Sequence, residues 1–266
     1  EVTFYVPTYM GGRPALELTK KMPNLKVLQV PNAGYDDAIE FLRPGITLCN
    51  GRGIHDDSTA ELAVALAIAS LRGLVTFVRD QDKGEWVNKT YNSINDRKIG
   101  IIGYGSIGST IARMLSGFSV DIVAFTQSGR DNTIAITDLD KHLPTLDVIF
   151  LILPLTKESK HLFDARRLGL MKDGALLVNV ARGPIVDTDA LVKELNSGRI
   201  TAALDVTDPE PLPKGHPLWS AKGVLISPHV GGNSSAFDRR ARRLIESQLN
   251  LLAQGKSLDN VIVAGN

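Results

Sequence analysis

The chain has 266 residues, with 30 basic and 29 acidic side chains, a formal net charge of +1 and 43% apolar residues. This balance is ordinary for a folded protein and gives no electrostatic reason to expect nucleic acid or a membrane as a partner. Cys49 is the single cysteine, which excludes a disulfide within the chain and fits a reducing, cytoplasmic compartment. The longest apolar stretches, 62–71 and 148–155, are shorter than the roughly 18 residues that a membrane span needs.

The first part of the chain, residues 1–57, carries short β-like runs separated by helical or turn-rich pieces. These runs are Val2–Val6, Leu25–Val30 and Ile46–Asn50. Ser58 and Glu61 then have the spacing of a capping box, which predicts an apolar helix with Ser58 as its N-cap that continues to about Leu71.

Between residues 98 and 229 the pattern becomes strongly α/β. Six apolar runs predict strands at Lys98–Ile102, Val120–Phe125, Asp147–Leu153, Ala175–Asn179, Thr201–Asp205 and Val224–Ser227. Amphipathic stretches such as Ile107–Leu115 and Ala190–Leu195 lie between several of them. Nearly continuous apolar strands that alternate with helices indicate a parallel sheet covered on both faces.

Helical spacing from Phe237 to Leu252 and an extended segment at Asn260–Val263 follow this region. The simplest architecture is an α/β protein in which a doubly wound (Rossmann) dinucleotide-binding domain, 58–233, is inserted in a smaller α/β substrate domain. The smaller domain is built from residues 1–57 and 234–266.

A glycine-rich segment follows the strand that ends at Ile102 and opens a helix: Gly103-Tyr104-Gly105-Ser106-Ile107-Gly108. In a dinucleotide-binding loop the first glycine permits a tight turn, the second lets the backbone approach a pyrophosphate, and the third lets helix pack on strand. The helix N-terminus then offers N–H groups to the phosphates. A mere glycine-rich turn is the alternative, and the flanking strand and helix argue against it.

The next strand normally ends in an acid, about 20 residues on, that binds the ribose of NAD. Here Thr126 stands at that position, and the first acid is Asp131. Without the carboxylate a 2′-phosphate is not repelled, Ser128 can donate a hydrogen bond to it, and Arg130 can pair with it. This favours NADP(H) over NAD(H), unless Arg130 is simply a solvated loop residue.

Three chemically suited side chains follow successive strands of the expected sheet. Arg182 comes after the fourth strand, Glu210 after the fifth, and His229 after the sixth. Reduction of a 2-keto acid needs a cation that holds the carboxylate and polarises the carbonyl, and a guanidinium does both. It also needs an acid that protonates the developing alkoxide, for which histidine is suited, and a carboxylate that stabilises the imidazolium.

Each of the three has a plain alternative: a surface ion-pair partner, a loop carboxylate and a core histidine. Their joint occurrence behind a dinucleotide loop favours the catalytic interpretation. The remaining histidines, at 55, 142, 161 and 216, have no comparable setting, and no cluster has metal-ligand spacing.

These residues resemble the D-isomer-specific 2-hydroxyacid dehydrogenases. The resemblance rests on Asn32–Asp36, Thr59–Glu61, Gly103–Gly108, Asn179–Asp187, Ala203–Pro211 and Ser227–Gly232. It implies hydride transfer between a nicotinamide and C2 of the acid to give the D-hydroxy acid, with Arg182 on the substrate and His229 and Glu210 as the acid–base pair.

The resemblance also implies further site residues. The N–H groups around Ala33 and Gly34 would hold the substrate carboxylate. Thr59 and Asp205 would lie near the nicotinamide, and Pro154 and Thr156 near the adenosine half. The same match assigns Leu153, Val180, Ala181 and Gly231 to the cofactor site.

Further implications concern the assembly and the smaller domain. The family is typically a homodimer, joined through the cofactor domain and the helix expected at Ser58–Leu71. The smaller domain is flavodoxin-like in the family and usually carries a strand–helix–strand ahead of the point where this chain begins, so we expect that segment to be absent. Thr126 departs from the family's usual acid and leans toward glyoxylate/hydroxypyruvate reductase-like members that use NADP.

Two other functions share this fold. In formate dehydrogenases a glutamine typically replaces the acid beside the histidine, so Glu210 argues against that function. A dinucleotide-sensing corepressor would be expected to carry disordered partner-binding tails, and residues 1–266 contain essentially no such segment, which favours the enzyme. Pocket size would decide among glyoxylate, hydroxypyruvate, pyruvate and bulkier 2-keto acids, and Arg52 is a candidate contact for a polar substrate tail.

Overall fold

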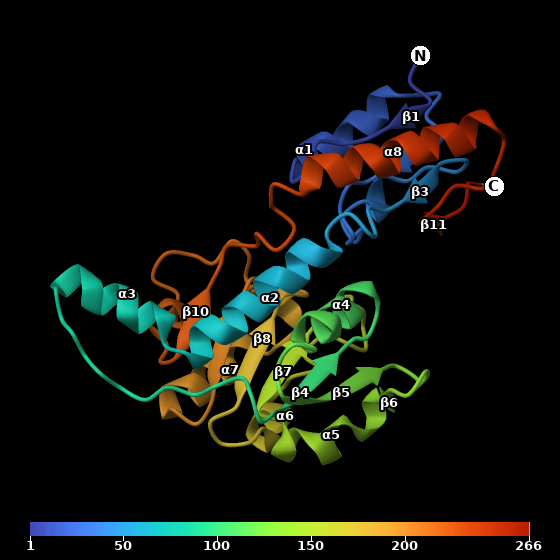
Figure 1. Cartoon of the computed structure of the whole chain (residues 1–266). Coiled ribbons are helices and arrows are strands. Elements are labelled where there is room, and N and C mark those ends of the chain that lie inside the picture. The colour runs from blue at the N-terminus through green and yellow to red at the C-terminus, as the bar shows by residue number, and fades with distance from the viewer. Residues whose placement is uncertain (266) are drawn as a thin grey trace. The chain divides into compact units, whose positions relative to one another are not determined.

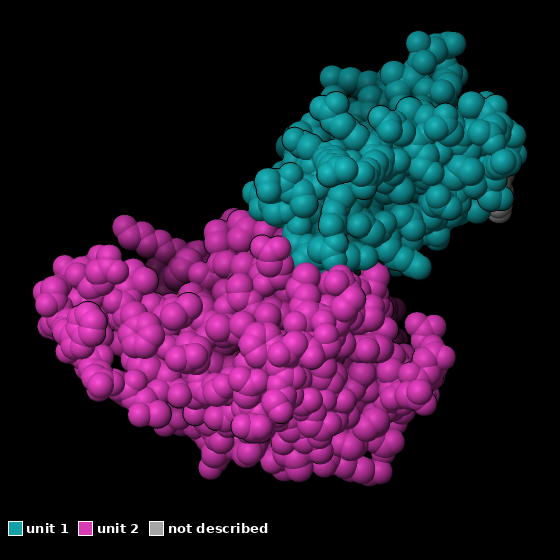
Figure 2. Space-filling view, in the orientation of Figure 1, with its two compact units in different colours: residues 1–58, 232–266 teal, residues 59–231 magenta. Residues whose placement is uncertain are grey.

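The computed structural model describes residues 1–265 and divides the chain into two compact units (Figure 2). Unit 2 is the continuous segment Thr59–Gly231, and unit 1 combines Glu1–Ser58 with the chain from Gly232 onward. The boundaries expected at 57/58 and 233/234 lie within two residues of these positions.

Unit 2 is built on a seven-stranded sheet in which every pair of neighbouring strands is parallel (Figure 1). Its order is β10-β9-β8-β7-β4-β5-β6. The strands are β4 (Arg97–Ile102), β5 (Val120–Thr126), β6 (Ile134–Ala135), β7 (Val148–Leu151), β8 (Leu176–Asn179), β9 (Thr201–Leu204) and β10 (Val224–Ile226). The strand order reverses direction between β4 and β7, which makes this pair the topological switch point of a doubly wound sheet.

Helices cover both faces of this sheet because alternate strand residues point to opposite sides. One apolar cluster joins α2 (Asp56–Leu71) and α4 (Ser106–Leu115) to Ile99, Ile101 and Phe150. The other joins α5 (Leu139–His142), α6 (Ala165–Leu170) and α7 (Thr188–Ser197) to Ile149 and Leu151. The alternation within β7 therefore sends neighbouring residues into different cores.

Unit 1 is a four-stranded sheet in the order β1-β2-β3-β11. The strands β1 (Phe4–Tyr5), β2 (Val27–Gln29) and β3 (Thr47–Cys49) are parallel, and β11 (Val261–Val263) pairs antiparallel with β3. The helices are α1 (Gly12–Glu17) and α8 (Phe237–Ala253). Gln248 of α8 is fully buried and donates hydrogen bonds to the Gln29 side chain and to the Asp259 carbonyl, each at 2.8 Å.

Three features differ from the sequence-based expectation. The prediction that Ser58 is the N-cap of a helix was wrong, because α2 already begins at Asp56. The Ser58 hydroxyl instead lies 2.6 Å from the Ser234 hydroxyl. The two-residue strand β6 was not expected. Neither was α3 (Leu74–Lys83), a helix with no buried residue, whose apolar side chains Leu74, Phe77 and Val78 are exposed.

Short 3₁₀ helices complete the fold at Leu18–Lys21, Ile39–Phe41, Ile136–Asp138, Leu143–Thr145, Gly183–Ile185 and Pro217–Ser220. Within residues 1–265, no single helix is long and apolar enough to cross a membrane. The pair α2 and α3 meets the criteria of length and composition only when taken together, and the two helices are bent by 61°.

Candidate active site

The glycine-rich loop has the geometry that a dinucleotide phosphate requires. Gly103 adopts a φ of +102°, and a Cβ placed there would lie 2.6 Å from the Ile152 carbonyl oxygen. A Cβ on Gly108 would lie 2.2 Å from the Gly103 carbonyl oxygen, so strand and helix approach too closely for a side chain. Nothing lies within 4 Å of a Cβ on Gly105, which immediately precedes α4. The loop thus leaves an open cradle at the N-terminus of α4.

A pocket of about 580 Å³ opens beside this cradle, within the range of small-molecule sites. It lies at the carboxyl ends of β4, β5 and β7. Eight of its lining residues were expected from the sequence: Gly103, Tyr104, Gly105, Thr126, Arg130, Leu153, Pro154 and Thr156. Others were missed, among them Gln127, Ile152, Glu158 and Leu162. Gln127 and Ile152 directly follow strand ends, which is the signal that would have identified them.

The end of β5 carries Thr126 where dinucleotide-binding domains normally have the acid that binds the ribose. The Thr126 hydroxyl lies 2.7 Å from that of Thr133 and accepts a hydrogen bond from the Gly129 N–H at 3.1 Å. Arg130 lines the pocket, and its exposed guanidinium lies 3.8 Å from Asp131. Ser128 is exposed and does not line the pocket. Of the two side chains expected to contact a 2′-phosphate, Arg130 therefore lines the pocket and Ser128 does not.

Arg182 lies in a sharply constrained loop after β8. The side chain of Asn179, which is buried at the end of that strand, donates to the Arg182 carbonyl and accepts from the Ala181 N–H, both at 3.0 Å. A Cβ on Gly183 would lie 1.9 Å from the Thr207 carbonyl oxygen, so the loops after β8 and β9 touch. Val180 and Ala181 are buried within this loop. This packing brings Arg182 close to the segment that carries Glu210.

His229 and Glu210 form a direct pair, as the sequence predicted. The Nδ1 atom of His229 lies 2.5 Å from Oε1 of Glu210, and both side chains are partly exposed. The hydrogen bond with His229 holds the pKa of the Glu210 carboxyl below its ordinary value. The charges of His229 and Arg182 and the backbone of Thr207 act in the same direction, while burial opposes them. The carboxylate is therefore kept ionised beside the imidazole.

The Asp205 carboxylate organises the loop that carries His229. Asp205 is 2% exposed, and it accepts hydrogen bonds from the Ser227 hydroxyl at 2.6 Å, the Val230 N–H at 2.9 Å and the Gly231 N–H at 2.8 Å. Its carbonyl also accepts from the His229 N–H at 2.8 Å. His229 itself has a φ of +52°, a strained conformation for a residue with a side chain. These bonds hold the strained turn in place.

Thr59 belongs to the same group of residues. A Cβ on Gly231 would lie 3.0 Å from the Asp205 carboxylate and 3.4 Å from the Thr59 methyl carbon. The structure thus brings together three of the residues that the family resemblance assigned to the cofactor. Ser227 was missed by the sequence reasoning. Its position at the end of the sixth predicted strand was the only signal in the sequence, and its bond to Asp205, 22 positions away, was not predictable from it.

In unit 1, two consecutive carbonyl groups of the loop after β2 accept hydrogen bonds from the segment that follows β3. The Asn32 carbonyl accepts from the Gly51 N–H at 2.7 Å, and the Ala33 carbonyl accepts from the Asn50 side chain at 2.7 Å. Within the described residues, the N–H groups of Ala33 and Gly34 have no hydrogen-bond acceptor, and both residues are partly exposed. These two N–H groups are therefore available to donate hydrogen bonds to a ligand.

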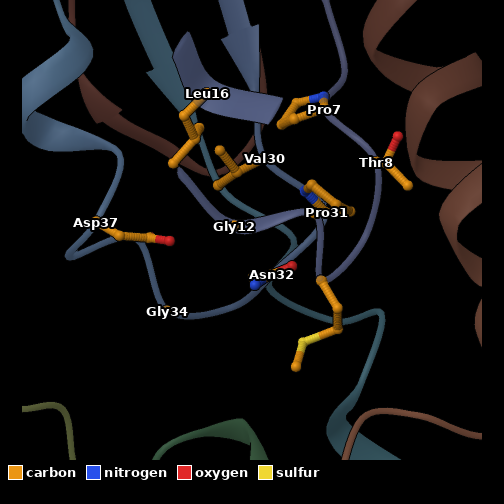
Figure 3. Close-up of a pocket in the computed structure, with 11 residues that line it drawn as sticks. Pro7, Thr8, Gly12, Leu16, Val30, Pro31, Asn32, Gly34 and Asp37 are labelled. Atoms are coloured by element: carbon orange, nitrogen blue, oxygen red, sulfur yellow. The ribbon is translucent and has the colours of Figure 1, made fainter. Parts of the chain in front are cut away.

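A small hollow adjoins this loop, and the residues that line it include Thr8, Gly12, Asn32, Gly34 and Asp37 (Figure 3). Its volume of about 20 Å³ is room for about one water molecule, which is too little for a substrate substituent. The Arg52 side chain is exposed and forms no ion pair with the residues described, and its contact with a polar substrate tail stays a prediction. Nowhere in residues 1–265 do three or more His, Cys, Asp or Glu side chains form a group able to hold a metal ion.

Comparisons with known proteins agree with this geometry. The sequence profile described as "D-isomer specific 2-hydroxyacid dehydrogenase, NAD binding domain" matches residues 64–231. A glyoxylate reductase of Thermofilum pendens is 37% identical over 253 residues, which cover 89% of this chain and 74% of the relative. The fold and site are those of a nicotinamide-dependent oxidoreductase. The chain belongs to the D-isomer-specific 2-hydroxyacid dehydrogenase family.

Solved structures extend the likeness to the whole chain. A family protein from Aeromonas salmonicida superposes with a TM-score of 0.88 at 30% identity, covering 99% of this chain and 86% of that one. A family member from Xanthobacter autotrophicus, solved with NADPH, has a TM-score of 0.81 at 27% identity, with 99% and 85% covered. An NAD-dependent formate dehydrogenase from Staphylococcus aureus, solved with NAD, reaches 0.81 at 28%, with 100% and 84% covered. Fold likeness alone therefore separates neither the two cofactors nor the two reactions.

The Glu210–His229 pair predicts a shifted carboxyl titration. We expect the Glu210 carboxyl, followed by ¹³C NMR, to protonate below the range that is ordinary for glutamate, and His229→Ala to move that titration upward. Because the folded-state pKa is depressed, the pair stabilises the fold above the ordinary carboxyl pKa, and this contribution is lost as pH falls through the depressed value. His216→Ala is the control and should leave the titration in place; an unmoved titration in His229→Ala would disprove the pairing.

Proposed function

We propose that the protein reduces a small 2-keto acid, such as glyoxylate or hydroxypyruvate, to the D-2-hydroxy acid in a reversible reaction. The observation that carries this proposal is the His229–Glu210 pair, 2.5 Å apart, at the same sheet edge as the dinucleotide loop. Arg182 follows β8, the immediate neighbour of the strand that precedes Glu210. When bound, NAD(P)H supplies the hydride.

The acid–base chemistry is assigned to His229. Its Nδ1 atom is engaged with Glu210, so Nε2 is the nitrogen available to donate a proton to the oxygen of the reduced carbonyl. The Glu210 carboxylate stabilises the imidazolium before the proton is transferred. In the reverse direction the neutral imidazole accepts the hydroxyl proton.

Substrate binding is assigned to Arg182 and, separately, to the loop after β2. The Arg182 guanidinium is suited to hold the substrate carboxylate and to polarise the carbonyl. The unpaired N–H groups of Ala33 and Gly34 support a second role in carboxylate binding. We assign Thr59, Asp205 and Gly231 to the surroundings of the nicotinamide, supported by their closeness to one another.

For the cofactor, we propose NADP(H) in preference to NAD(H). Thr126 brings no negative charge to the pocket, and Arg130 supplies a cation at its rim. A 2′-phosphate carries about two negative charges at neutral pH and pairs with a guanidinium. The open cradle at Gly105 and the adjoining pocket accommodate the pyrophosphate and adenosine portions.

Formate oxidation and dinucleotide sensing are the competing functions. Glu210 disfavours the first, because oxidation of formate transfers a hydride and leaves no alkoxide to protonate. A dinucleotide sensor can retain Arg182, Glu210 and His229, so an assay of turnover is what distinguishes it from the enzyme.

The reaction is tested by following the oxidation of NADPH and NADH with glyoxylate, hydroxypyruvate, pyruvate and a bulky aromatic 2-keto acid. We expect turnover with the small acids. His229→Ala should lower kcat by about 10²- to 10⁴-fold with unchanged NADPH binding, because the imidazole acts on the carbonyl oxygen. Arg182→Ala should lower kcat/KM by about 100-fold or more through loss of charged hydrogen bonds to the acid.

Binding of dinucleotide without turnover of any of these acids would favour the sensor. Loss of NADPH binding in His229→Ala would show that this residue has been given the wrong role. An unchanged kcat/KM in Arg182→Ala would remove Arg182 from the site.

The cofactor preference is tested at Arg130. Arg130→Ala should raise KM for NADPH about 10-fold, which corresponds to one charged hydrogen bond, with little effect on KM for NADH. Thr126→Asp should shift the preference toward NADH by repelling the 2′-phosphate and binding the ribose hydroxyls. Arg72→Ala, at another exposed arginine of unit 2, serves as the control. Equal losses with both cofactors in Arg130→Ala would contradict the assignment.

We also propose a homodimer, supported by apolar side chains that unit 2 leaves exposed around α3. Phe77, Val78 and Val87 are 41–59% exposed, and Trp86 is 98% exposed. Exposed apolar groups of this size mark an interaction surface. This support comes from α3 and the segment after it, whereas the sequence reasoning named the α2 region.

Sedimentation of the wild type should report a dimer. Trp86→Glu should weaken association, because it introduces a charge where the indole would be buried in the dimer. Trp219→Glu, at the other tryptophan of unit 2, should leave the dimer intact. A monomeric wild type, or equal effects of the two substitutions, would exclude this surface.

A further inference from the structure

The loop after β2 has one carbonyl that is held by a histidine. His55 is 5% exposed, and its Nε2 atom lies 2.9 Å from the carbonyl oxygen of Pro31. The next two carbonyls, of Asn32 and Ala33, are bound by Gly51 and Asn50. All three consecutive carbonyls therefore face the segment after β3, while the N–H groups of Ala33 and Gly34 stay unpaired within the described chain.

The other ring nitrogen of His55 faces the point where the chain re-enters unit 1. Its Nδ1 atom lies 3.2 Å from the Gly232 carbonyl oxygen. A Cβ on Gly232 would lie 2.6 Å from both His55 Nδ1 and the Tyr9 hydroxyl, so no side chain fits there. His55 thus contacts both the proposed carboxylate loop and the first residue after the unit boundary.

Aromatic packing fixes the plane of this imidazole. The His55 ring stacks on Phe237, with centroids 5.4 Å apart and an interplanar angle of 6°, and on Tyr9 at 5.0 Å and 25°. Tyr9 and Phe237 also stack on each other at 4.3 Å. A ring confined in this way can direct its nitrogens only along fixed lines, so the bond to Pro31 is constrained in direction as well as length.

Only one of the two nitrogen contacts is a hydrogen bond when the imidazole is neutral. Burial lowers the pKa of His55; the carbonyls of Pro31 and Gly232 and the charge of Asp56 oppose that effect, and the charge of Arg240 adds to it. The neutral ring has a single N–H, and we assign it to Nε2 because the contact with Pro31 is the shorter one.

We propose that His55 is a positioning residue for substrate binding: by holding the Pro31 carbonyl, it keeps the N–H groups of Ala33 and Gly34 available for the substrate carboxylate. The inference rests on the function proposed above for that loop. His55 does not touch the substrate in this proposal. Its loss would loosen the donor site without affecting the proton transfer assigned to His229.

Three substitutions separate the two nitrogen contacts. A glutamine amide nitrogen reaches about as far as Nε2, so His55→Gln can retain the bond to Pro31. An asparagine amide nitrogen corresponds to Nδ1, so His55→Asn retains at most the contact with Gly232. His55→Phe keeps an aromatic ring in the stack and loses both contacts. We expect KM for glyoxylate to rise by about 10-fold in His55→Asn and His55→Phe and by less than about 3-fold in His55→Gln, with smaller changes in kcat.

Phe237→Leu is the matched control for a purely structural effect. It removes a ring from the stack and keeps both His55 contacts, so it should lower the melting temperature while KM for glyoxylate changes by less than about 2-fold. The affinity for NADPH, whose proposed site lies in unit 2, should be the same in all four variants. If KM follows the melting temperature across the series, regardless of which contact is kept, His55 has only a structural role and the proposal fails.

Hydrogen–deuterium exchange of the Gly51 amide, which donates to the Asn32 carbonyl at 2.7 Å, tests without any turnover whether the loop is held in place. Exchange of this amide should be faster in His55→Asn and His55→Phe than in the wild type and His55→Gln. Equal exchange in all variants would overturn the proposal even if the enzyme is active. If this ranking holds but no 2-keto acid is reduced, the result supports the positioning role of His55 and excludes the proposed reaction.

Discussion

The parallel pairing of the seven strands of unit 2 is the constraint on which the site depends. Because all strands run in one direction, each carboxyl end, and the loop that follows it, lies at the same edge of the sheet. Residues spread over more than a hundred positions of the chain therefore meet in one row. Thr126 is the last residue of β5, and the other five follow β4, β7, β8, β9 and β10: Gly103, Leu153, Arg182, Glu210 and His229. Strand order, rather than chain order, determines which of them become neighbours.

Buried polar side chains at strand ends then give these loops their shapes. Asn179 is the last residue of β8, and Asp205 and Asn50 directly follow β9 and β3. Each of the three side chains bonds to the backbone of a loop that carries a proposed functional group. A polar group buried without a partner is costly, so each of these side chains stabilises only the loop conformation that satisfies it. His55 acts in the same way on the loop after β2. The apolar core sets the strand positions, and a few polar groups set the loop conformations.

The strands and the main site residues were predictable because their signals are local. Four-residue apolar runs such as Val148–Leu151 identify buried strands, and the side chain that follows each run identifies the active edge. Long-range contacts were not predictable in this way. The Ser234 hydroxyl, 176 positions away, bonds to Ser58, whose spacing to Glu61 mimics a capping box. The helix α3 was missed although Leu74, Phe77 and Val78 follow helical spacing, and these side chains are exposed in the described chain. The partners of Asp205 were missed because they lie 22 to 26 positions away along the chain.

The discontinuity of unit 1 has a consequence for the order of folding. Thr59–Gly231 is one uninterrupted segment and can form its sheet from neighbouring crossovers. Unit 1 must instead pair β3 with β11, which requires Cys49 to meet Val261 across the whole intervening chain. An unfolded loop of that length is entropically expensive to close, and a folded insertion with its two ends close together reduces the cost. During synthesis the residues of the inserted unit leave the ribosome before β11 does, so we expect β11 to pair with β3 after unit 2 has folded.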